Sequence, residues 1–202
     1  MTKIKLCGLS RSCDIEAVND IMPEYVGFVF ASKSKRYVTP EKAAELKALL
    51  KPNIQAVGVF VREAPETVAR LLSDGIIDMA QLHGGEDEAY LKQLRQLTDK
   101  PIIQAFRIQS AADITKAEKS SADFVLLDSG AGTGTTFDWG LIQSIRRPYF
   151  LAGGLSPDNV ADAVAQLKPY AVDVSSGIET GGLKDQKKMT AFAAAVRKEE
   201  AL

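Results

Sequence analysis

The sequence predicts an α/β fold, a (β/α)8 TIM barrel that forms a single domain over residues 1–202. Eight short, apolar, β-branched runs recur along the chain, as is typical of parallel strands that are buried on both faces. Each run is followed by a polar turn and a stretch with the hydrophobic period of a helix. Because such a barrel needs at least about 200 residues, eight units in a chain of this length favour a closed barrel over an open doubly wound sheet.

The expected strands are spread along the whole chain, and no linker, low-complexity tract or change of composition divides them. They begin near Ile4, Tyr25, Ile54, Asp78, Ile102, Asp123, Tyr149 and Ala171. We therefore expect no second domain.

The stretches between these strands carry signals for the start and end of helices. Thr39 is a candidate N-cap, and Pro40 suits the first helical position. Pro65 opens another helix, which Gly75 is placed to end. Further helices are expected over residues 86–98 and 110–120, after the pair Ser156 and Pro157, and over residues 186–198 with Phe192 toward the core.

Charge and cysteine content argue against several kinds of partner and compartment. The chain has 25 basic and 26 acidic residues and a pI of about 5.9, which gives no reason to expect nucleic acid or an anionic membrane as a partner. No apolar run reaches the ~18 residues of a membrane span, and the strand-like first residues lead us to expect no signal peptide. Cys7 and Cys13 have no disulfide framework around them, which indicates a reduced, cytoplasmic chain.

Two turns of small residues follow the last two expected strands, and together they predict a phosphate site. Gly153–Gly154 follows the first of these strands, and Ser175–Ser176–Gly177 follows the second. Glycine lets backbone N–H groups approach an anion without a Cβ in the way, and phosphate commonly binds after strands 7 and 8 of such a barrel. The alternative is two tight turns that bind no ligand.

Cys7 and Asp128 are the candidate catalytic residues, since each ends an expected strand at the face where barrel enzymes place their active sites. A free cysteine is usually a small buried hydrophobe, and this interpretation is kept for Cys13 within the first helix. Asp128 follows an apolar run, where a carboxylate is poorly solvated and suits a general acid. Its alternative roles are a helix cap or a partner for a lysine.

Other polar residues at the same face invite a binding role. Arg36 lies in a basic loop after the second expected strand and could hold a substrate carboxylate through paired hydrogen bonds, the alternative being a solvated basic loop. His83 is the only histidine, and no CxxC or HExxH pattern is present, so we expect no metal. The sequence has no nicotinamide, flavin or pyridoxal signature. Residues 129–138 are rich in glycine and are interpreted as a mobile loop that closes over the site, with Trp139 anchoring its far end.

The motifs of this chain resemble those of one enzyme family, in the same order and along nearly the whole chain. The family is that of phosphoribosylanthranilate isomerase, an enzyme of tryptophan biosynthesis. Lys35, before Arg36, and Ala131 depart from the residues usual in the family, and neither contacts the expected chemistry. The motifs that carry the resemblance are KLCGL, GFVFASKSKRYVTPEKA, VGVFV, QLHGGE, LLDSGAGTGTTFDW, LAGGLSPDNV and DVSSGIE.

The resemblance implies a barrel that catalyses an Amadori rearrangement of a small sugar phosphate. By similarity Cys7 is the general base and Asp128 the general acid, and Arg36 binds the anthranilate carboxylate. The phosphate would be bound by backbone N–H groups of Gly154, Ser176 and Gly177, whereas His83 matches a family motif without an assigned step. The substrate supplies its own electron sink, so no cofactor is expected, and the chain is expected to be a monomer or a homodimer.

Two other functions remain as alternatives. One is the related isomerase of histidine biosynthesis, which uses two aspartates, so that Cys7 argues against it. The other is a sugar-phosphate-binding barrel without catalytic activity. The presence of both Cys7 and Asp128 argues against that function, because phosphate binding needs neither.

Overall fold

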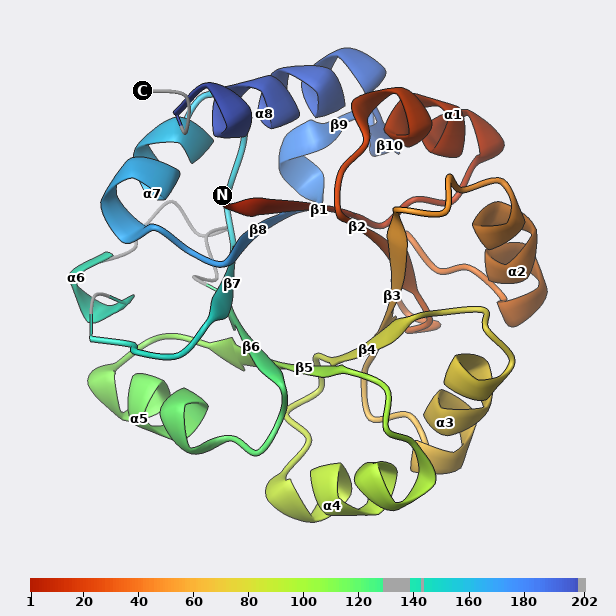
Figure 1. The fold of residues 1–202 in the computed structure, drawn as a ribbon, viewed down its shortest axis with the longest axis vertical. Coiled ribbons are helices and arrows are strands. Elements are labelled where there is room, and N and C mark those ends of the chain that lie inside the picture. Colours follow the sequence, from red (N-terminus) through yellow and green to blue (C-terminus); the bar gives the residue numbers. More distant parts are fainter. Residues whose placement is uncertain (129–138, 143, 200–202) are drawn as a thin grey trace.

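The predicted eight-stranded barrel is confirmed in a computed structural model that describes residues 1–128, 139–142 and 144–199. All neighbouring strands are parallel, and β1 pairs with both β2 and β8, which closes the sheet. Figure 1 looks along the barrel, with the helices arranged around it. The strands are β1 (Lys3–Cys7), β2 (Tyr25–Val29), β3 (Gln55–Phe60), β4 (Met79–Leu82), β5 (Ile102–Arg107), β6 (Phe124–Asp128), β7 (Tyr149–Ala152) and β8 (Ala171–Val174).

Eight α-helices lie in the described part of the chain and alternate with these strands. The predicted caps are confirmed: the Thr39 side chain accepts a hydrogen bond from the Lys42 N–H (3.2 Å), and Gly75 follows α3 with a positive φ of 71°. The helices are α1 (Ser12–Ile21), α2 (Pro40–Ala48), α3 (Pro65–Ser73), α4 (Glu88–Leu97), α5 (Ala111–Lys119), α6 (Trp139–Ile142), α7 (Val160–Leu167) and α8 (Gln186–Glu199).

Helix α7 begins later than the sequence predicted. Ser156 and Pro157 were expected to open it, yet the first helical residue is Val160. The Ser156 N–H donates to the side chain of Asn159 (2.8 Å), and the Asn159 amide donates to the Gly154 carbonyl (2.9 Å). These bonds hold residues 154–159 in a turn, because asparagine side chains compete for local backbone groups. The turn that follows β7 is thereby fixed from within.

A short hairpin after β8 was not predicted. The 3-10 helix η1 (Ser176–Ile178) leads into strands β9 (Glu179–Thr180) and β10 (Leu183–Lys184), which pair antiparallel. Gly181 and Gly182 join them with φ values of 60° and 81°, as a two-residue hairpin turn with two positive φ angles requires. The hairpin brings Glu179 and Lys184 next to each other.

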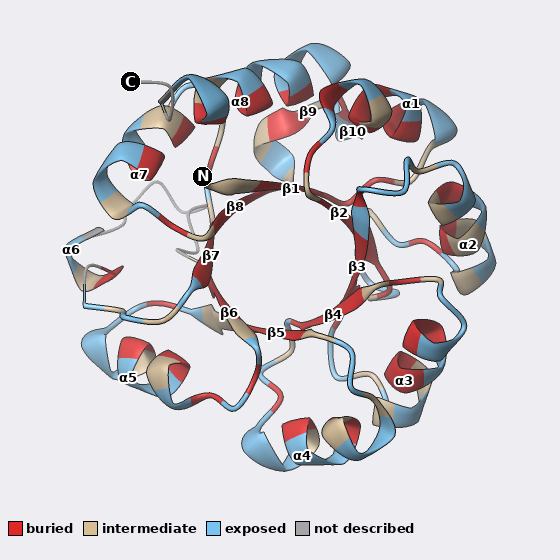
Figure 2. Ribbon diagram, in the orientation of Figure 1, coloured by how far each residue is buried: buried red, intermediate tan, exposed pale blue. Residues whose placement is uncertain are grey.

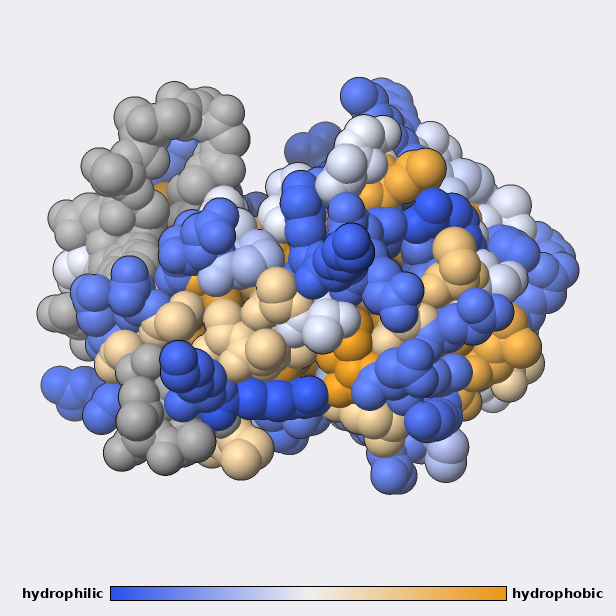
Figure 3. All heavy atoms as spheres, turned by 90° about the horizontal axis from the view of Figure 1, so that it is seen from above, coloured by the Kyte–Doolittle hydropathy of each residue, from blue (hydrophilic) through white to orange (hydrophobic). Residues whose placement is uncertain are grey.

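The core has two layers, one inside the barrel and one between the sheet and the helices. Figure 2 shows buried residues along the strands and on the inward faces of the helices. Burial of each large aliphatic or aromatic side chain contributes about 1.5–3 kcal/mol. Seen at right angles to that view, hydrophilic residues cover much of the surface (Figure 3). The interior layer contains Tyr25, Val57, Met79, Ile103, Leu126, Phe150, Ala152 and Ala171.

The two cysteines differ in burial. Cys7 is buried at the end of β1, whereas Cys13 is exposed, so the interpretation of Cys13 as a buried hydrophobe is wrong. Cys13 is the second residue of α1, next to Asp14, whose buried carboxylate accepts hydrogen bonds from the Ser10 and Arg11 N–H groups (3.0 Å each). That arrangement turns Asp14 inward and leaves its neighbour on the solvent side.

The predicted loop over residues 129–138 and the side chain of Trp139 lie outside the described residues. Among the helices that the structure describes, none is both long enough and apolar enough to cross a membrane.

Candidate active site

A cavity of about 430 Å³ lies at the carboxyl ends of the strands, where barrel enzymes place their catalytic groups. The structure brings most of the predicted site residues together around it. Six of the seven line the cavity: Cys7, Arg36, His83, Asp128, Gly154 and Ser176. Gly177 does not line it, but it lies next to Ser176 in the same turn.

Cys7 is placed by the last position of β1, with 7% of its surface exposed. Burial raises the pKa of its thiol above the ordinary value, because the charged thiolate loses hydration. The Lys5 ammonium counteracts this most strongly, the Asp173 carboxylate adds to it, and the Lys184 ammonium also lowers the pKa. The ligand-free site therefore holds Cys7 mainly as a protonated thiol near neutral pH.

Below Cys7, Lys5 and Asp173 form a buried ion pair with a distance of 2.9 Å between Nζ and Oδ2. The two residues face each other in the register of β1 and β8. Burial lowers the pKa of Lys5, but the Asp173 carboxylate and the Cys7 sulfur together outweigh this effect and raise that pKa above its ordinary value. The second carboxylate oxygen of Asp173 is buried and has no hydrogen-bond partner among the described residues. Since Asp173 lines the cavity, this oxygen is available to a donor on a bound molecule.

Asp128 ends β6 and is contacted by His83 from the loop after β4. The His83 Nε2 lies 3.5 Å from the Asp128 Oδ2, and the His83 Nδ1 lies 2.9 Å from the Gln81 amide nitrogen. The amide donates to Nδ1, which leaves the proton of a neutral imidazole on Nε2, facing Asp128. The chain Gln81–His83–Asp128 thus orients the candidate acid, and it gives His83 a structural role that the sequence did not reveal.

Arg36 lines the cavity, and its guanidinium forms a fork on a protein carboxylate. Its Nε and Nη2 donate to the two oxygens of Glu179 at 2.6 and 2.8 Å. The Lys184 ammonium also contacts Glu179 (2.6 Å) and donates to the Ser175 carbonyl (2.8 Å). Burial raises the pKa of Glu179, but hydrogen bonds from Arg36 and Lys184 outweigh it and hold that pKa below its usual value. Glu179 therefore stays ionised and fixes Arg36 at the cavity rim.

The two glycine turns meet at the end of β7 and β8. Gly154 has a φ of 65°, a conformation that favours glycine. A Cβ on Gly177 would lie 1.9 Å from the Leu155 carbonyl oxygen, so only glycine permits this approach of the two turns. Among the described residues, no hydrogen-bond acceptor contacts the N–H groups of Gly154, Ser176 and Gly177. Unpaired donors on adjacent turns are suited to an anion.

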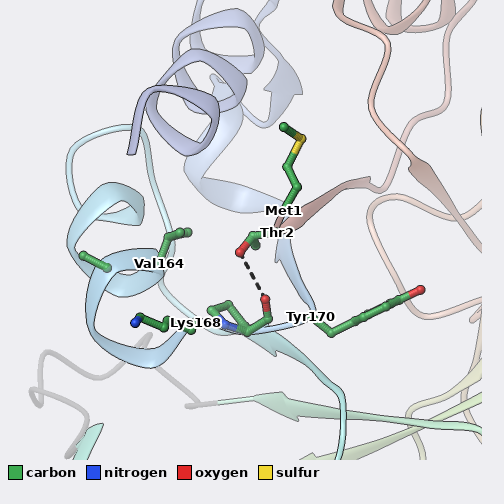
Figure 4. A pocket seen from close by; sticks show the side chains of 7 residues that line it. Met1, Thr2, Val164, Lys168 and Tyr170 are labelled. Atoms are coloured by element: carbon green, nitrogen blue, oxygen red, sulfur yellow. Dashed lines mark hydrogen bonds between the residues drawn. The ribbon is translucent and has the colours of Figure 1, made fainter. Parts of the chain in front are cut away.

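A larger cavity, of about 800 Å³, lies at the opposite end of the barrel. Figure 4 shows Met1 and Thr2 beside Val164 and Lys168, with the Thr2 hydroxyl donating to the Pro169 carbonyl (3.1 Å). No cysteine, histidine or carboxylate is among the described residues that line it. In the part of the chain that the structure describes, no group of three or more His, Cys, Asp and Glu side chains could hold a metal ion.

Four charged residues of the site were not predicted from the sequence: Lys5, Asp173, Glu179 and Lys184. Two signals were available for them. Lys5 and Asp173 are charges within short apolar strands, which is unusual where both faces of a strand are buried. The Gly181–Gly182 pair between short runs is a hairpin signal, and it would have placed Lys184 opposite Glu179.

Comparisons with known proteins found relatives that match nearly the whole chain. Residues 4–195 match the family model described as N-(5'phosphoribosyl)anthranilate (PRA) isomerase. The chain is 45% identical over 194 residues to N-(5'-phosphoribosyl)anthranilate isomerase of Endomicrobium trichonymphae, covering 94% of this chain and 95% of the relative. The crystal structure of the Thermotoga maritima phosphoribosyl anthranilate isomerase superposes with a TM-score of 0.91 at 35% identity, covering 98% and 100% of the two chains. A phosphoribosyl anthranilate isomerase in complex with reduced 1-(o-carboxyphenylamino)-1-deoxyribulose 5-phosphate superposes with a TM-score of 0.88 at 34% identity, covering 98% and 100%.

Proposed function

This chain belongs to the N-(5'-phosphoribosyl)anthranilate isomerase family, and on that premise we propose that Cys7 and Asp128 are the base and the acid of its reaction. The chain is an isomerase of tryptophan biosynthesis. It converts N-(5'-phosphoribosyl)anthranilate into 1-(2-carboxyphenylamino)-1-deoxyribulose 5-phosphate by an Amadori rearrangement. The observation that supports the two catalytic roles is that Cys7 and Asp128, on strands three apart in the closed barrel, line one cavity with the glycine turns.

The first step opens the furanose ring, and Asp128 is placed to assist it. A carboxylic acid at the end of β6 gives a proton to the ring oxygen, and the bond between that oxygen and the anomeric carbon breaks. The nitrogen lone pair of the anthranilate then forms an iminium ion with the anomeric carbon. The imidazole of His83, which contacts Asp128, keeps the acid oriented toward the cavity.

The second step removes the proton from the neighbouring carbon, and Cys7 is placed to accept it. The iminium ion acidifies that C–H bond and takes up the electron pair, so an enolamine forms, which tautomerises to the ketone. Burial holds the pKa of Cys7 high in the free protein. A positive iminium ion beside the sulfur lowers that pKa, so the thiolate is favoured at the step in which it is needed.

The remaining residues bind the two anionic ends of the substrate. The N–H groups of Gly154, Ser176 and Gly177 would hold the phosphate. Arg36 would hold the anthranilate carboxylate through the guanidinium edge that Glu179 does not occupy, since Glu179 takes Nε and Nη2. The free oxygen of Asp173 would accept a hydrogen bond from a sugar hydroxyl. Phosphate and carboxylate held at separate places leave the reacting carbons between Cys7 and Asp128.

Family membership decides against the two alternatives raised by the sequence. The histidine-pathway isomerase uses two aspartates, and a non-catalytic binding barrel needs neither Cys7 nor Asp128. Neither function therefore accounts for the presence of both residues. The substrate is a small sugar phosphate. We further propose that residues 1–202 form one domain, that the chain works in the cytoplasm as a monomer or a homodimer, and that it binds no nucleic acid. The free cysteines support the cytoplasmic location, and the balanced charge supports the lack of a nucleic-acid partner.

The proposal is tested by turnover of N-(5'-phosphoribosyl)anthranilate generated in the cuvette, followed through the loss of anthranilate fluorescence. Cys7→Ser keeps the shape of the side chain but replaces the thiol with a hydroxyl, which is a far weaker acid, and it should be almost inactive while still binding product. Cys13→Ser is the matched control and should keep full activity, because Cys13 is exposed on α1. An active Cys7→Ser protein would assign proton abstraction to another group.

A further inference from the structure

Lys5 is a charged side chain inside the barrel that the proposed mechanism does not use. It is completely buried and forms an ion pair with Asp173 across β1 and β8. A buried ion pair is weak support for stability, because desolvation of both ions cancels much of their attraction. Replacement of a buried ion pair by apolar residues of similar volume is often neutral or stabilising. The charge of Lys5 therefore calls for an explanation other than packing.

The position of Lys5 relative to Cys7 supplies that explanation. Lys5 precedes Cys7 by two residues on the same strand, and residues two apart point to the same face. The Lys5 ammonium interacts with the Cys7 thiol as well as with Asp173. Lys5 is thus fixed by Asp173 on the face of β1 that also carries the sulfur of the candidate base.

The other groups around Cys7 leave Lys5 as its main cation. On β2 the sulfur faces Gly27, where an added Cβ would lie 2.5 Å from it, and Val29 and Val59 complete an apolar wall. The charged groups that act on Cys7 from other elements are Asp173 on β8, Lys184 on β10 and Arg36 after β2. Lys184 and Arg36 both form ion pairs with Glu179 at 2.6 Å, which reduces their effect at the sulfur.

We propose that Lys5 is a positioning residue for the reaction: its ammonium, fixed by Asp173, stabilises the Cys7 thiolate as the thiolate forms inside the barrel. This inference deepens the proposed function and rests on it for its importance in catalysis. No proton leaves Lys5 in the proposed step. The ammonium remains charged and compensates the negative charge that the sulfur carries before it accepts the substrate proton.

The inference is tested by the rate at which iodoacetamide alkylates Cys7 as a function of pH, without substrate. All proteins carry Cys13→Ser, so that Cys7 is the only thiol. Lys5→Met removes the ammonium and keeps the length of the side chain. An opposite charge within about 4–6 Å changes a pKa by about 1–3 pH units. Loss of Lys5 should therefore lower the alkylation rate at pH 7 by about tenfold or more and displace the pH profile upward.

A second pair of variants tests the same point without leaving a lone buried carboxylate. Asp173→Asn is compared with Asp173→Asn plus Lys5→Met, and the second protein should again alkylate about tenfold more slowly. If Lys5→Met alone does not fold, as judged by circular dichroism, this pair gives the result. Lys3→Met is the matched control, because Lys3 lies on the same strand and contacts tyrosine hydroxyls instead of Cys7. Its alkylation profile should match that of the parent protein.

Unchanged Cys7 alkylation on removal of Lys5 in either background would overturn the inference, as would an equal slowing in Lys3→Met. The outcome is separate from that of the proposed function. If Cys7→Ser were active, Cys7 would not be the base, yet the alkylation profiles would still report whether Lys5 stabilises its thiolate.

Discussion

Strand β1 carries two lysines, Lys3 at its amino end and Lys5 nearer its carboxyl end, and the two have different surroundings. At the carboxyl end, Lys5 is fully buried against Asp173 and next to Cys7. At the amino end, the Lys3 ammonium donates to the Tyr170 hydroxyl at 2.7 Å and lies 4.6 Å from the centre of the Tyr170 ring. Tyr170 also stacks on Phe124, with ring centres 5.0 Å apart. Lys5 thus lies beside the candidate active site, whereas Lys3 packs against aromatic side chains.

The comparison of the two ends separates polar groups that are available to a ligand from side chains that stabilise the fold. At the carboxyl end, a carboxylate oxygen of Asp173 and three backbone N–H groups have no partner among the described residues. Such groups cost stability unless a ligand completes them. At the amino end, the larger cavity has no acid or base pair among its described lining residues. Cavity size alone would place the active site at the amino end, whereas the unpaired polar groups indicate the carboxyl end.

Asp128→Asn, at the carboxyl end of the barrel, should have the largest effect on activity. Asparagine keeps the size and polarity of the side chain but cannot give an acid proton to the ring oxygen. A missing general acid lowers kcat by at least ~100-fold, and the circular dichroism spectrum should stay unchanged. Turnover by purified Asp128→Asn protein at the parent rate would remove Asp128 from the mechanism.

Gly154→Asp should weaken substrate binding, because it places a carboxylate where the phosphate is expected. Charge-assisted hydrogen bonds contribute about 1.5–3 kcal/mol, so KM should rise roughly 10- to 100-fold. Gly75→Asp is the matched control: Gly75 also has a positive φ, 71° against 65°, but it follows α3 at the other end of the barrel. Equal KM values in the two variants would contradict the phosphate assignment.

Arg36→Met should act selectively on substrates with a ring carboxylate. The loss of a charge-assisted pair corresponds to about tenfold or more in kcat/KM for the carboxylated substrate. An analogue without the carboxylate should lose much less. Equal losses on both would instead assign Arg36 to the contact with Glu179, that is, to the structure of the β9–β10 hairpin.

Tyr170→Phe tests the amino end, where we expect the smallest effect on activity. The substitution keeps the stacked ring and removes the hydroxyl that accepts from Lys3. The free energy of unfolding should fall by about 1–3 kcal/mol, and the midpoint of thermal unfolding by about 2–4 °C for each kcal/mol. Steady-state kinetics should remain within about twofold of the parent. A large fall in kcat at full folding would show that the two ends are coupled.

The same division explains what the sequence could predict. The parallel strands of the barrel and the positions of Cys7, Asp128 and Gly154 follow from local patterns, because each lies at the end of an apolar run. The late start of α7 depends on the Asn159 side chain, and the pairing of Lys5 with Asp173 joins residues from the two ends of the chain. Contacts of that kind depend on barrel closure and strand register, which no local pattern contains. The link from Arg36 to Glu179 likewise needs the β9–β10 hairpin, which the sequence did not predict.

The central claim is that the reaction occurs at the carboxyl end, with Cys7 and Asp128 on opposite sides of the substrate. A crystal structure of this chain with reduced 1-(o-carboxyphenylamino)-1-deoxyribulose 5-phosphate tests it most directly. The account predicts the phosphate at the N–H groups of Gly154, Ser176 and Gly177. It also predicts that the two reacting carbons of the ligand lie between the Cys7 sulfur and the Asp128 carboxylate. A phosphate bound in the cavity at the amino end, or Cys7 and Asp128 on the same side of those carbons, would contradict it.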